Sequence, residues 1–132
     1  MKEIDEIVSK EEFNIFFNKY NRSYFVDNVE TLIRKLLDEL TFEMKILKAS
    51  FQLIKEKSAF SACGFRRSKD YFFVEFFNEE RINNERIIRE VKVDVEVQGG
   101  KKEYIISRVE IKDKNDIDDE LIQWITKSYE LF

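Results

Sequence analysis

The chain has 132 residues, which is enough for one domain with its own core and too few for two. It contains no His, no Pro and a single Cys, Cys63, which excludes Ser-His and Cys-His catalytic pairs, His-ligated metals and an internal disulfide. The net charge of −4 is spread over 38% charged residues of both signs, so the composition indicates no dominant nucleic-acid-binding surface.

The same composition predicts a location in the cell. No apolar run approaches the roughly 20 residues that a membrane helix needs, and the start, Met1-Lys2-Glu3, lacks the apolar core of a signal peptide. A lone cysteine agrees with a reducing compartment. We therefore expect one cytoplasmic domain, residues 1–132, that does not enter a membrane.

The first predicted helix carries a stripe of aromatic side chains. Ser9 and Glu12 have the spacing of a capping box, in which each side chain satisfies a free backbone N–H group of the other residue. Aromatic residues then fall on one helical face, at Phe13, Phe16, Phe17 and Tyr20. We expect this face to pack on the core, with a partner-binding helix as the alternative.

A longer helix is predicted next. Asp27 and Glu30 repeat the capping spacing, and one apolar face continues for about five turns through Val29, Leu32, Ile33, Leu36, Leu37, Leu40, Met44 and Leu47. We place the end of this helix near Ala49. The pattern of Phe51, Leu53 and Ile54 leaves two alternatives open, a further helical turn and a short strand.

From Ser58 the pattern changes to strands. Residues 59–65 and 71–77 are predicted to form a hairpin around the polar turn 66–70. In Tyr71–Phe77 both sets of alternating side chains are largely apolar, which is typical of a buried central strand. We expect the long and the last helices to cover one face of this strand. The other face then meets the aromatic helix, a ligand or a second copy of the protein.

The clearest strand alternates between apolar and charged residues. One face is expected in the core and the other in water, with Val91, Val93, Val95 and Val97 on the first and Lys92, Asp94 and Glu96 on the second.

Two glycines, Gly99 and Gly100, predict a hairpin turn after the valine strand, and its partner strand is expected at residues 102–111. A two-residue Gly-Gly loop would pair Val95 with Tyr104. A loop of residues 99–101 would pair Val95 with Ile105 and would bring the aliphatic side chains together. We prefer the second register.

The last predicted element is a helix that begins after a polar break at 113–116. Acidic residues suit a helix start and gather there, at Asp116, Asp118, Asp119 and Glu120. The apolar face of this helix is made by Leu121, Trp124, Ile125, Ser128 and Phe132. The predicted fold is therefore α+β, with N-terminal helices, a four-stranded antiparallel meander and a C-terminal helix.

Two segments of the second half resemble a known family. They are residues 62–72, a strand, a basic turn and an aromatic strand, and residues 108–111 with 116–130, a strand, an acidic helix start and a terminal helix. They are similar to a family of small domains of unknown function, found free-standing or as C-terminal tails of restriction-type and predicted nuclease chains, and sometimes labelled predicted transport protein. The resemblance covers roughly residues 58–130. It implies an α+β fold of antiparallel strands and no established activity.

Candidate binding residues lie mainly in the basic turn. Arg66, Arg67 and Lys69, beside Tyr71, offer forked donors for phosphate and an aromatic face for a base. The alternative is a solvated hairpin tip whose charges discourage edge pairing. Cys63 has no His partner and is expected to be a buried, inert thiol.

Three hypotheses about function follow. The leading one is a non-enzymatic interaction domain that binds protein or nucleic acid through the Arg66–Lys69 turn, or forms a homodimer through an aromatic face. The family context implies a role accessory to nucleic-acid-related machinery. The first alternative is a small-molecule pocket between the sheet and the long helix, with Lys57 and Arg66 as polar anchors.

The weakest alternative is a metal-dependent hydrolase built from Asp94 and the triplet Glu110-Ile111-Lys112. The same Glu-x-Lys triplet recurs at 43–45 and 90–92, as chance predicts in so charged a chain. We therefore expect no enzymatic activity, no cofactor and no metal site.

Overall fold

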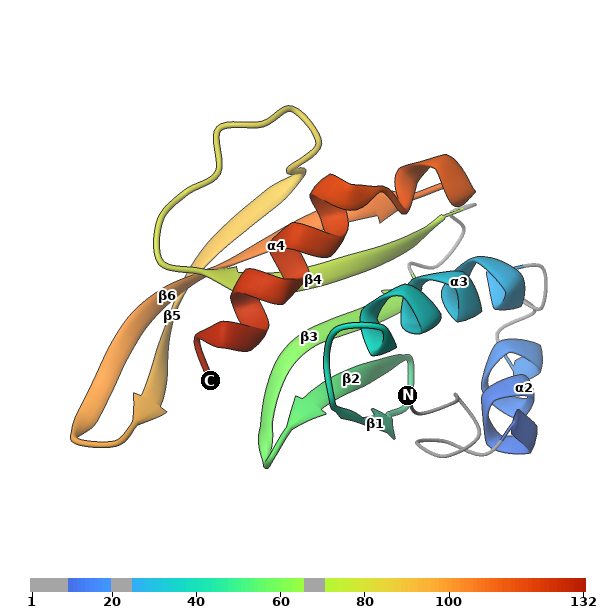
Figure 1. Ribbon diagram of the computed structural model, residues 1–132, viewed down its shortest axis with the longest axis horizontal. Helices are drawn as coiled ribbons and strands as arrows, with labels where there is room; N and C mark the ends of the chain where they lie inside the picture. The colour runs from blue at the N-terminus through green and yellow to red at the C-terminus, as the bar shows by residue number, and fades with distance from the viewer. Residues whose placement is uncertain (1–9, 20–24, 66–70) are drawn as a thin grey trace.

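The computed structural model describes residues 10–19, 25–65 and 71–132. Within these ranges the expected α+β class is confirmed, but the sheet has six strands and not four (Figure 1). The helices are α2 (Lys10–Lys19), α3 (Val26–Leu37) and α4 (Asp119–Glu130), with a short 3-10 turn at Lys114–Asp116. The strands are β1 (Glu43–Ile46), β2 (Ser50–Lys55), β3 (Ser58–Phe65), β4 (Phe72–Asn78), β5 (Arg89–Val97) and β6 (Gly100–Ile111).

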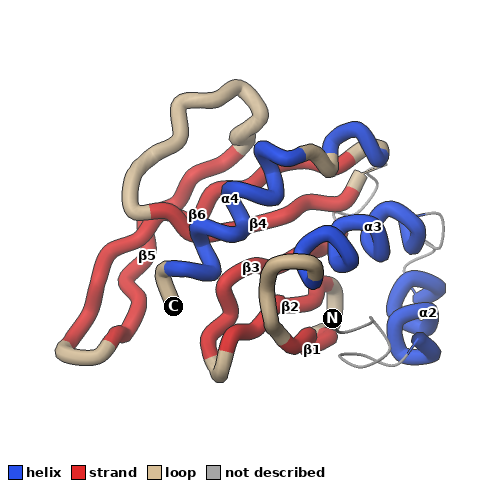
Figure 2. The backbone as a smooth tube through the Cα atoms, in the orientation of Figure 1, coloured by secondary structure: helices blue, strands red, loops and turns tan. Residues whose placement is uncertain are grey.

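The strand order is β1-β2-β3-β4-β6-β5, with every neighbouring pair antiparallel. The expected meander is therefore wrong, because β4 pairs with β6 and β5 lies at the edge. Since β4 and β5 are both antiparallel to β6, they run parallel to each other, and the chain must travel back between them. Residues 79–88 make this return as a long loop, which is tan in Figure 2.

The segment predicted as the end of the long helix forms two strands instead. Helix α3 ends at Leu37, and Met44 on β1 lies opposite Leu53 on β2. Met44, Phe51 and Leu53 are buried and their neighbours on each strand are not, a period of two that the helical spacing of Leu40 and Met44 had concealed. Asp27 likewise lies in the first turn of α3, whose N-cap, Phe25, makes no side-chain capping bond.

The β5–β6 hairpin turns at Gln98 and Gly99, one residue earlier than either predicted loop. Val95 consequently lies opposite Lys102, so the preferred pairing with Ile105 and the alternative pairing with Tyr104 are both wrong. Gly99 has a φ of 94°, which an L side chain rarely adopts and which fixes the turn at that position.

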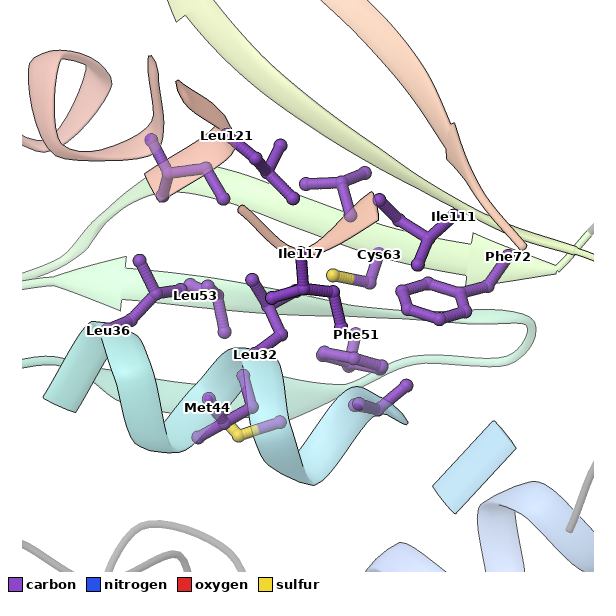
Figure 3. Packing of buried hydrophobic residues seen from close by; sticks show 14 of the residues in the cluster. Leu32, Leu36, Met44, Phe51, Leu53, Cys63, Phe72, Ile111, Ile117 and Leu121 are labelled. Carbon is purple, nitrogen blue, oxygen red and sulfur yellow. The ribbon is translucent and has the colours of Figure 1, made fainter. Parts of the chain in front are cut away.

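One face of the sheet packs against the helices and holds the core (Figure 3). The rings of α2 lie on this side, where Phe13 and Phe16 contact Phe51, and Phe16 and Phe17 contact Phe65. The aromatic helix therefore belongs to the core, as expected, and does not cover the second face of β4. Ser9 and Tyr20 lie outside the described residues.

Helix α4 crosses the same face over β3 and β4 (Figure 1). Its side chains Leu121, Ile125 and Ser128 are buried, and the indole of Trp124 stacks on Phe76 with ring centres 5.6 Å apart. These positions confirm the predicted apolar face for Leu121, Trp124, Ile125 and Ser128. Phe132 follows the end of the helix, and its ring packs on Phe77 and Tyr104. In the part of the chain that the structure describes, no helix is long and apolar enough to cross a membrane.

Candidate functional site

The second face of the sheet carries no helix of the described ranges. Strand register places Phe73, Glu75 and Phe77 of β4 on this open face, beside Ile106 and Arg108 of β6. All five side chains are partly exposed. The second face of the aromatic strand, whose cover the sequence left open, is therefore a surface, except at Phe77, whose ring packs against Tyr104 and Phe132.

The four valines of β5 lie on the open face as well. Val91 is paired with Ile106 and is 38% exposed, and the other three valines are partly exposed. The alternation predicted for this strand is correct, but its apolar side does not face the helix-covered core. The aliphatic residues of β6 that do face the core are Ile105, Val109 and Ile111.

At the centre of the open face, Phe73 lies across Gly64 of the neighbouring strand. A Cβ atom at Gly64 would be 2.6 Å from Cζ of Phe73, so the ring occupies space that only glycine leaves free. The guanidinium carbon of Arg108 lies 3.9 Å from the centre of the same ring, in a cation–π contact. Gly64, Phe73 and Arg108 therefore form one stack on the surface of the sheet.

Arg108 also pairs with an acidic neighbour. Its Nη2 atom lies 3.4 Å from Oε1 of Glu75, and the exposed fractions of the two side chains are 14% and 26%. The Nε atom of Arg108 is buried and has no hydrogen-bond acceptor among the described residues. Part of the charge at the centre of the face is thus already removed from water.

A hollow of about 210 Å³ opens beside Glu75. The pairing of β2 with β3 shifts its register between Leu53 and Ile54. Opposite this shift, two successive residues of β3, Phe60 and Ser61, are both buried. The open side of β3 therefore presents only small side chains there. The hollow is lined by residues that include Gln52, Ala59, Ala62, Phe77 and Ile106.

The hollow is smaller than the 300 Å³ or more that is typical of small-molecule sites, and its size suits one large apolar side chain. The charges around it are balanced. Among the described residues on the open side, acidic and basic side chains are equal in number, namely Glu43, Glu75, Glu79 and Glu110 against Lys45, Arg89, Lys102 and Arg108. This described part of the face therefore offers no surface suited to a polyphosphate backbone.

The structure does not bring the predicted binding residues together. Arg66, Arg67 and Lys69 lie outside the described residues, so the predictions for them stay predictions. Lys57 is exposed in the turn before β3, and Tyr71, which is partly exposed, directly precedes β4. Because β3 and β4 are antiparallel, Lys57 and Tyr71 lie at opposite ends of β3, roughly 25 Å apart at about 3.3 Å per residue.

The two alternative hypotheses find little support in the geometry. The side of α3 that faces the sheet is packed, with Leu32, Ile33 and Leu36 fully buried in the core. Asp94 and Glu110 lie on opposite faces of the sheet. Glu110 pairs with Phe73 on the open side, whereas Asp94 lies with Lys92 and Glu96 on the other face of β5. They cannot hold one metal ion, so the hydrolase hypothesis is wrong.

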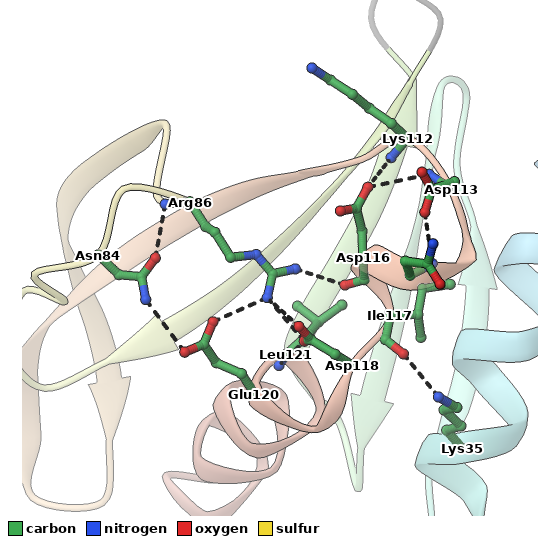
Figure 4. A network of polar contacts seen from close by, with 11 residues as sticks. Lys35, Asn84, Arg86, Lys112, Asp113, Asp116, Ile117, Asp118, Glu120 and Leu121 are labelled. Atoms are coloured by element: carbon green, nitrogen blue, oxygen red, sulfur yellow. Dashed lines mark hydrogen bonds and ion pairs between the residues drawn. The ribbon is translucent and has the colours of Figure 1, made fainter.

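The acidic residues before α4 have a structural role (Figure 4). Asp118 is the N-cap of the helix and accepts a hydrogen bond from the Leu121 N–H group. Arg86, from the return loop, donates to Asp118 at 2.9 Å, to Glu120 at 3.1 Å and to the carbonyl of Asp116 at 2.7 Å. The network fastens the loop to the helix. No group of three or more potential ligand residues suited to a metal ion occurs among the described residues.

The network also shifts the pKa values of its members. Partial burial raises the pKa of Asp118, but the Leu121 N–H group and Arg86 outweigh it, and the net pKa is lowered. Burial lowers the pKa of Arg86, and its bonds to Asp118 and Glu120 more than reverse this. Cys63 is fully buried, and its pKa is raised by burial first and by the charge of Glu75 second.

The comparisons with known proteins show the family only. The model of a family described as a domain of unknown function, DUF5655, matches residues 19–132. No curated protein and no solved structure matches the chain. The match confirms the resemblance seen in the second half and extends it over α3, β1 and β2.

Sequence reasoning missed the centre of the open face. The sequence predicted Phe73 and Glu75 as members of the aromatic strand, but it predicted Arg108 and Gly64 only as parts of other strands, with no contact to Phe73. The available signal was the acidic residue, Glu75, inside an otherwise apolar strand, because a carboxylate there needs a partner. Which residue pairs with it depends on the β4–β6 register, which the expected meander did not contain.

Proposed function

We propose that this chain, which belongs to the DUF5655 family of domains of unknown function, is a non-enzymatic module that binds a polypeptide on the open face of its sheet. The hollow between Ala62, Phe77 and Ile106 is the observation that carries the proposal. It is apolar, it has the size of one large side chain, and it lies on a face that no described helix covers. A partner would insert an apolar anchor there, as interface hot spots do.

The surroundings of the hollow support this assignment. Glu75 and Arg108 are partly buried in the free domain, so covering them with a partner costs less desolvation than covering fully solvated charges. Their pairing leaves the rim nearly neutral, which suits polar contacts around an apolar centre. A protein contact of this kind would also serve the role in nucleic-acid-related machinery that the family resemblance implies.

Two other kinds of partner are less well supported. Nucleic acid would need an excess of basic groups, and the described residues of the open face carry no such excess. Nucleic-acid binding through Arg66, Arg67 and Lys69 would be strongly salt-dependent. A small molecule between the sheet and α3 would have to displace packed core side chains. The open face is therefore the better supported site.

The test is a selection of peptides from a phage-displayed random library on the purified full chain. Peptides that bind are re-measured on Ala62→Leu, which fills the hollow, and on Gln123→Leu, a matched change at an exposed position of α4. We expect Ala62→Leu to weaken binding about tenfold or more and Gln123→Leu to leave it unchanged.

Amide NMR shifts provide the second measurement. Peptide addition should move the signals of residues around the hollow, including Ala62, Glu75 and Ile106. Selected peptides that bind Ala62→Leu as tightly as the wild type, or that move signals only on the helix side, would refute the proposal.

A further inference from the structure

β5 forms one edge of the sheet. The strand is nine residues long, is the last strand of the sheet order and pairs only with β6 among the described strands (Figure 1). The opposite edge, β1, has only four residues. Long, regular edge strands are templates for pairing with another chain unless a proline, a bulge or an inward charge blocks them. β5 contains no proline, its register with β6 is regular, and its inward-turned charge, Glu90, is bound by the Ile82 N–H group and the Ser107 hydroxyl.

The sequence of β5 is complementary to itself in one antiparallel register. When two copies are related by a two-fold axis at Val93, that residue faces its own counterpart, and Val91 faces Val95 of the other copy. On the other side of the strand, Lys92 of each copy faces Asp94 of the other. The central pairs are thus valine against valine on the open side and opposite charges on the other side, whereas at the two ends Val97 faces Arg89 and Glu90 faces Glu96.

The neighbouring registers are less favourable. A shift of the axis to Lys92 places lysine against lysine, and a shift to Asp94 places aspartate against aspartate. A shift to Val95 places Asp94 against Glu96. A shift to Val91 places Glu90 against Lys92, but it shortens the overlap of the two strands to residues 89–93. Because side chains alternate, registers that mix the two faces are excluded, so the axis at Val93 combines a central charge match with the longest overlap.

The isolated chain has a defect that this pairing corrects. Within the β5–β6 hairpin Asp94 lies directly opposite Glu103, and like charges in that position are destabilising. Lys92 is 4.0 Å from Glu103, and both side chains are 61% exposed, so the existing contact is weak. A lysine from a second copy would lie beside Asp94. Glu90, which would face Glu96, is turned inward and accepts bonds from the Ile82 N–H group and the Ser107 hydroxyl.

We propose that two copies of this chain associate through their β5 strands, antiparallel and centred on Val93, to form one continuous twelve-stranded sheet. A two-fold axis perpendicular to the sheet keeps both open faces on the same side. The dimer therefore presents two hollows and an uninterrupted stripe of valines on one surface. This inference is independent of what the open face binds, and each can fail without the other.

Charge reversal at the edge tests the register. We measure association by sedimentation velocity for the wild type, Lys92→Asp and Asp94→Lys, and for the double variant. Each single change creates two like-charge contacts across the axis and should weaken the dimer about tenfold, or about 1.4 kcal/mol. The double variant should recover association. A mixture of the two single variants should form a heterodimer, because every contact across its axis is again between opposite charges.

Disulfide trapping provides the second measurement. The native Cys63 is buried, so a cysteine introduced on β5 is the accessible thiol of the described surface. Val93→Cys should cross-link rapidly under mild oxidation, since the two positions face each other across the axis. Val91→Cys is the matched control on the same face, and its two copies would be about 13 Å apart, four residues along the strand.

Three results would overturn the proposal. The wild type could stay monomeric at concentrations of hundreds of micromolar, the mixed single variants could fail to associate, or Val91→Cys could cross-link as fast as Val93→Cys. Circular dichroism of each variant confirms the folded state, which these substitutions at exposed or partly exposed positions should preserve. Peptide binding to the open face is measured separately and does not enter this test.

Discussion

Ser128 of α4 and Phe77 of β4 are joined by a hydrogen bond of 2.8 Å, which the backbone N–H of Phe77 donates to the serine hydroxyl. The same hydroxyl donates to the carbonyl of Phe60 on β3 and is fully buried. A single small side chain therefore fixes the last helix to two neighbouring strands, just beyond the last pair of residues between β3 and β4.

Replacing this hydroxyl should destabilise the fold. In Ser128→Ala a buried donor and a buried acceptor both lose their partner, and we expect a loss of about 2 kcal/mol in the free energy of unfolding. Urea denaturation followed by fluorescence of Trp124 measures it. A change below about 0.5 kcal/mol would mean that the hydroxyl does not hold the strands.

Thr126 on the same helix should behave in the opposite way. Its Oγ1 atom is buried and has no hydrogen-bond partner among the described residues. Thr126→Val removes this unsatisfied group at nearly constant volume, so we expect unchanged or slightly higher stability, by up to about 1 kcal/mol. The same urea titration provides the value, and a clear loss would show that the hydroxyl is satisfied in solution.

The stack on the open face predicts coupling between Gly64 and Phe73. In Gly64→Ala the new Cβ atom meets the Phe73 ring, and we expect a loss of about 1–3 kcal/mol because ring and backbone must shift. In a Phe73→Ala background the same change should cost much less, since the ring is gone. A double-mutant cycle measures the coupling, and additive effects would contradict the contact.

The Arg86–Asp118 pair predicts a pH dependence. The pKa of Asp118 is lowered in the folded state, so its charge stabilises the fold above its ordinary pKa of about 3.8, and this contribution is lost as the pH falls through the lower folded value. The difference in melting temperature between the wild type and Asp118→Asn should be constant above about pH 5 and should shrink below about pH 4.

Arg86→Ala is the control for this titration, because it removes the guanidinium that contributes to the shift. In an Arg86→Ala background, the difference in melting temperature caused by Asp118→Asn should depend less on pH. The pair is partly exposed, so we expect Arg86→Ala to cost only about 1–2 kcal/mol, most of it from the lost anchoring of the return loop. An unchanged pH profile would contradict the role assigned to Arg86.

Cys63 should be chemically silent in the native domain. Its side chain is fully buried and its pKa is raised, so little thiolate forms and reagents cannot reach it. We expect no reaction with Ellman's reagent on the time scale of minutes in buffer and one thiol per chain in urea. Rapid native labelling would show that β3 opens readily.

Local pattern decided much of this fold. The stripe of Phe13, Phe16 and Phe17 and the alternation of residues 91–97 specify a helix and a strand whatever surrounds them, because the periods 3.6 and 2 are properties of the backbone. The last helix was also predicted from local pattern, since its acidic start and its apolar face indicate the same element. The pattern of region 38–55 was misleading, because Leu40, Met44 and Leu47 satisfy a helical spacing, whereas the residues that β1 and β2 bury are Met44, Phe51 and Leu53.

What the sequence by itself determined is therefore the type of most elements, the α+β class and the family. Tertiary structure alone decided which strand lies beside which, and hence which face is open. The exchange of β5 and β6 depends on a ten-residue loop and on Arg86 reaching the start of α4. Such long-range pairings leave no local period in the chain, yet they place Glu75 beside Arg108 and leave the valines of β5 at the edge.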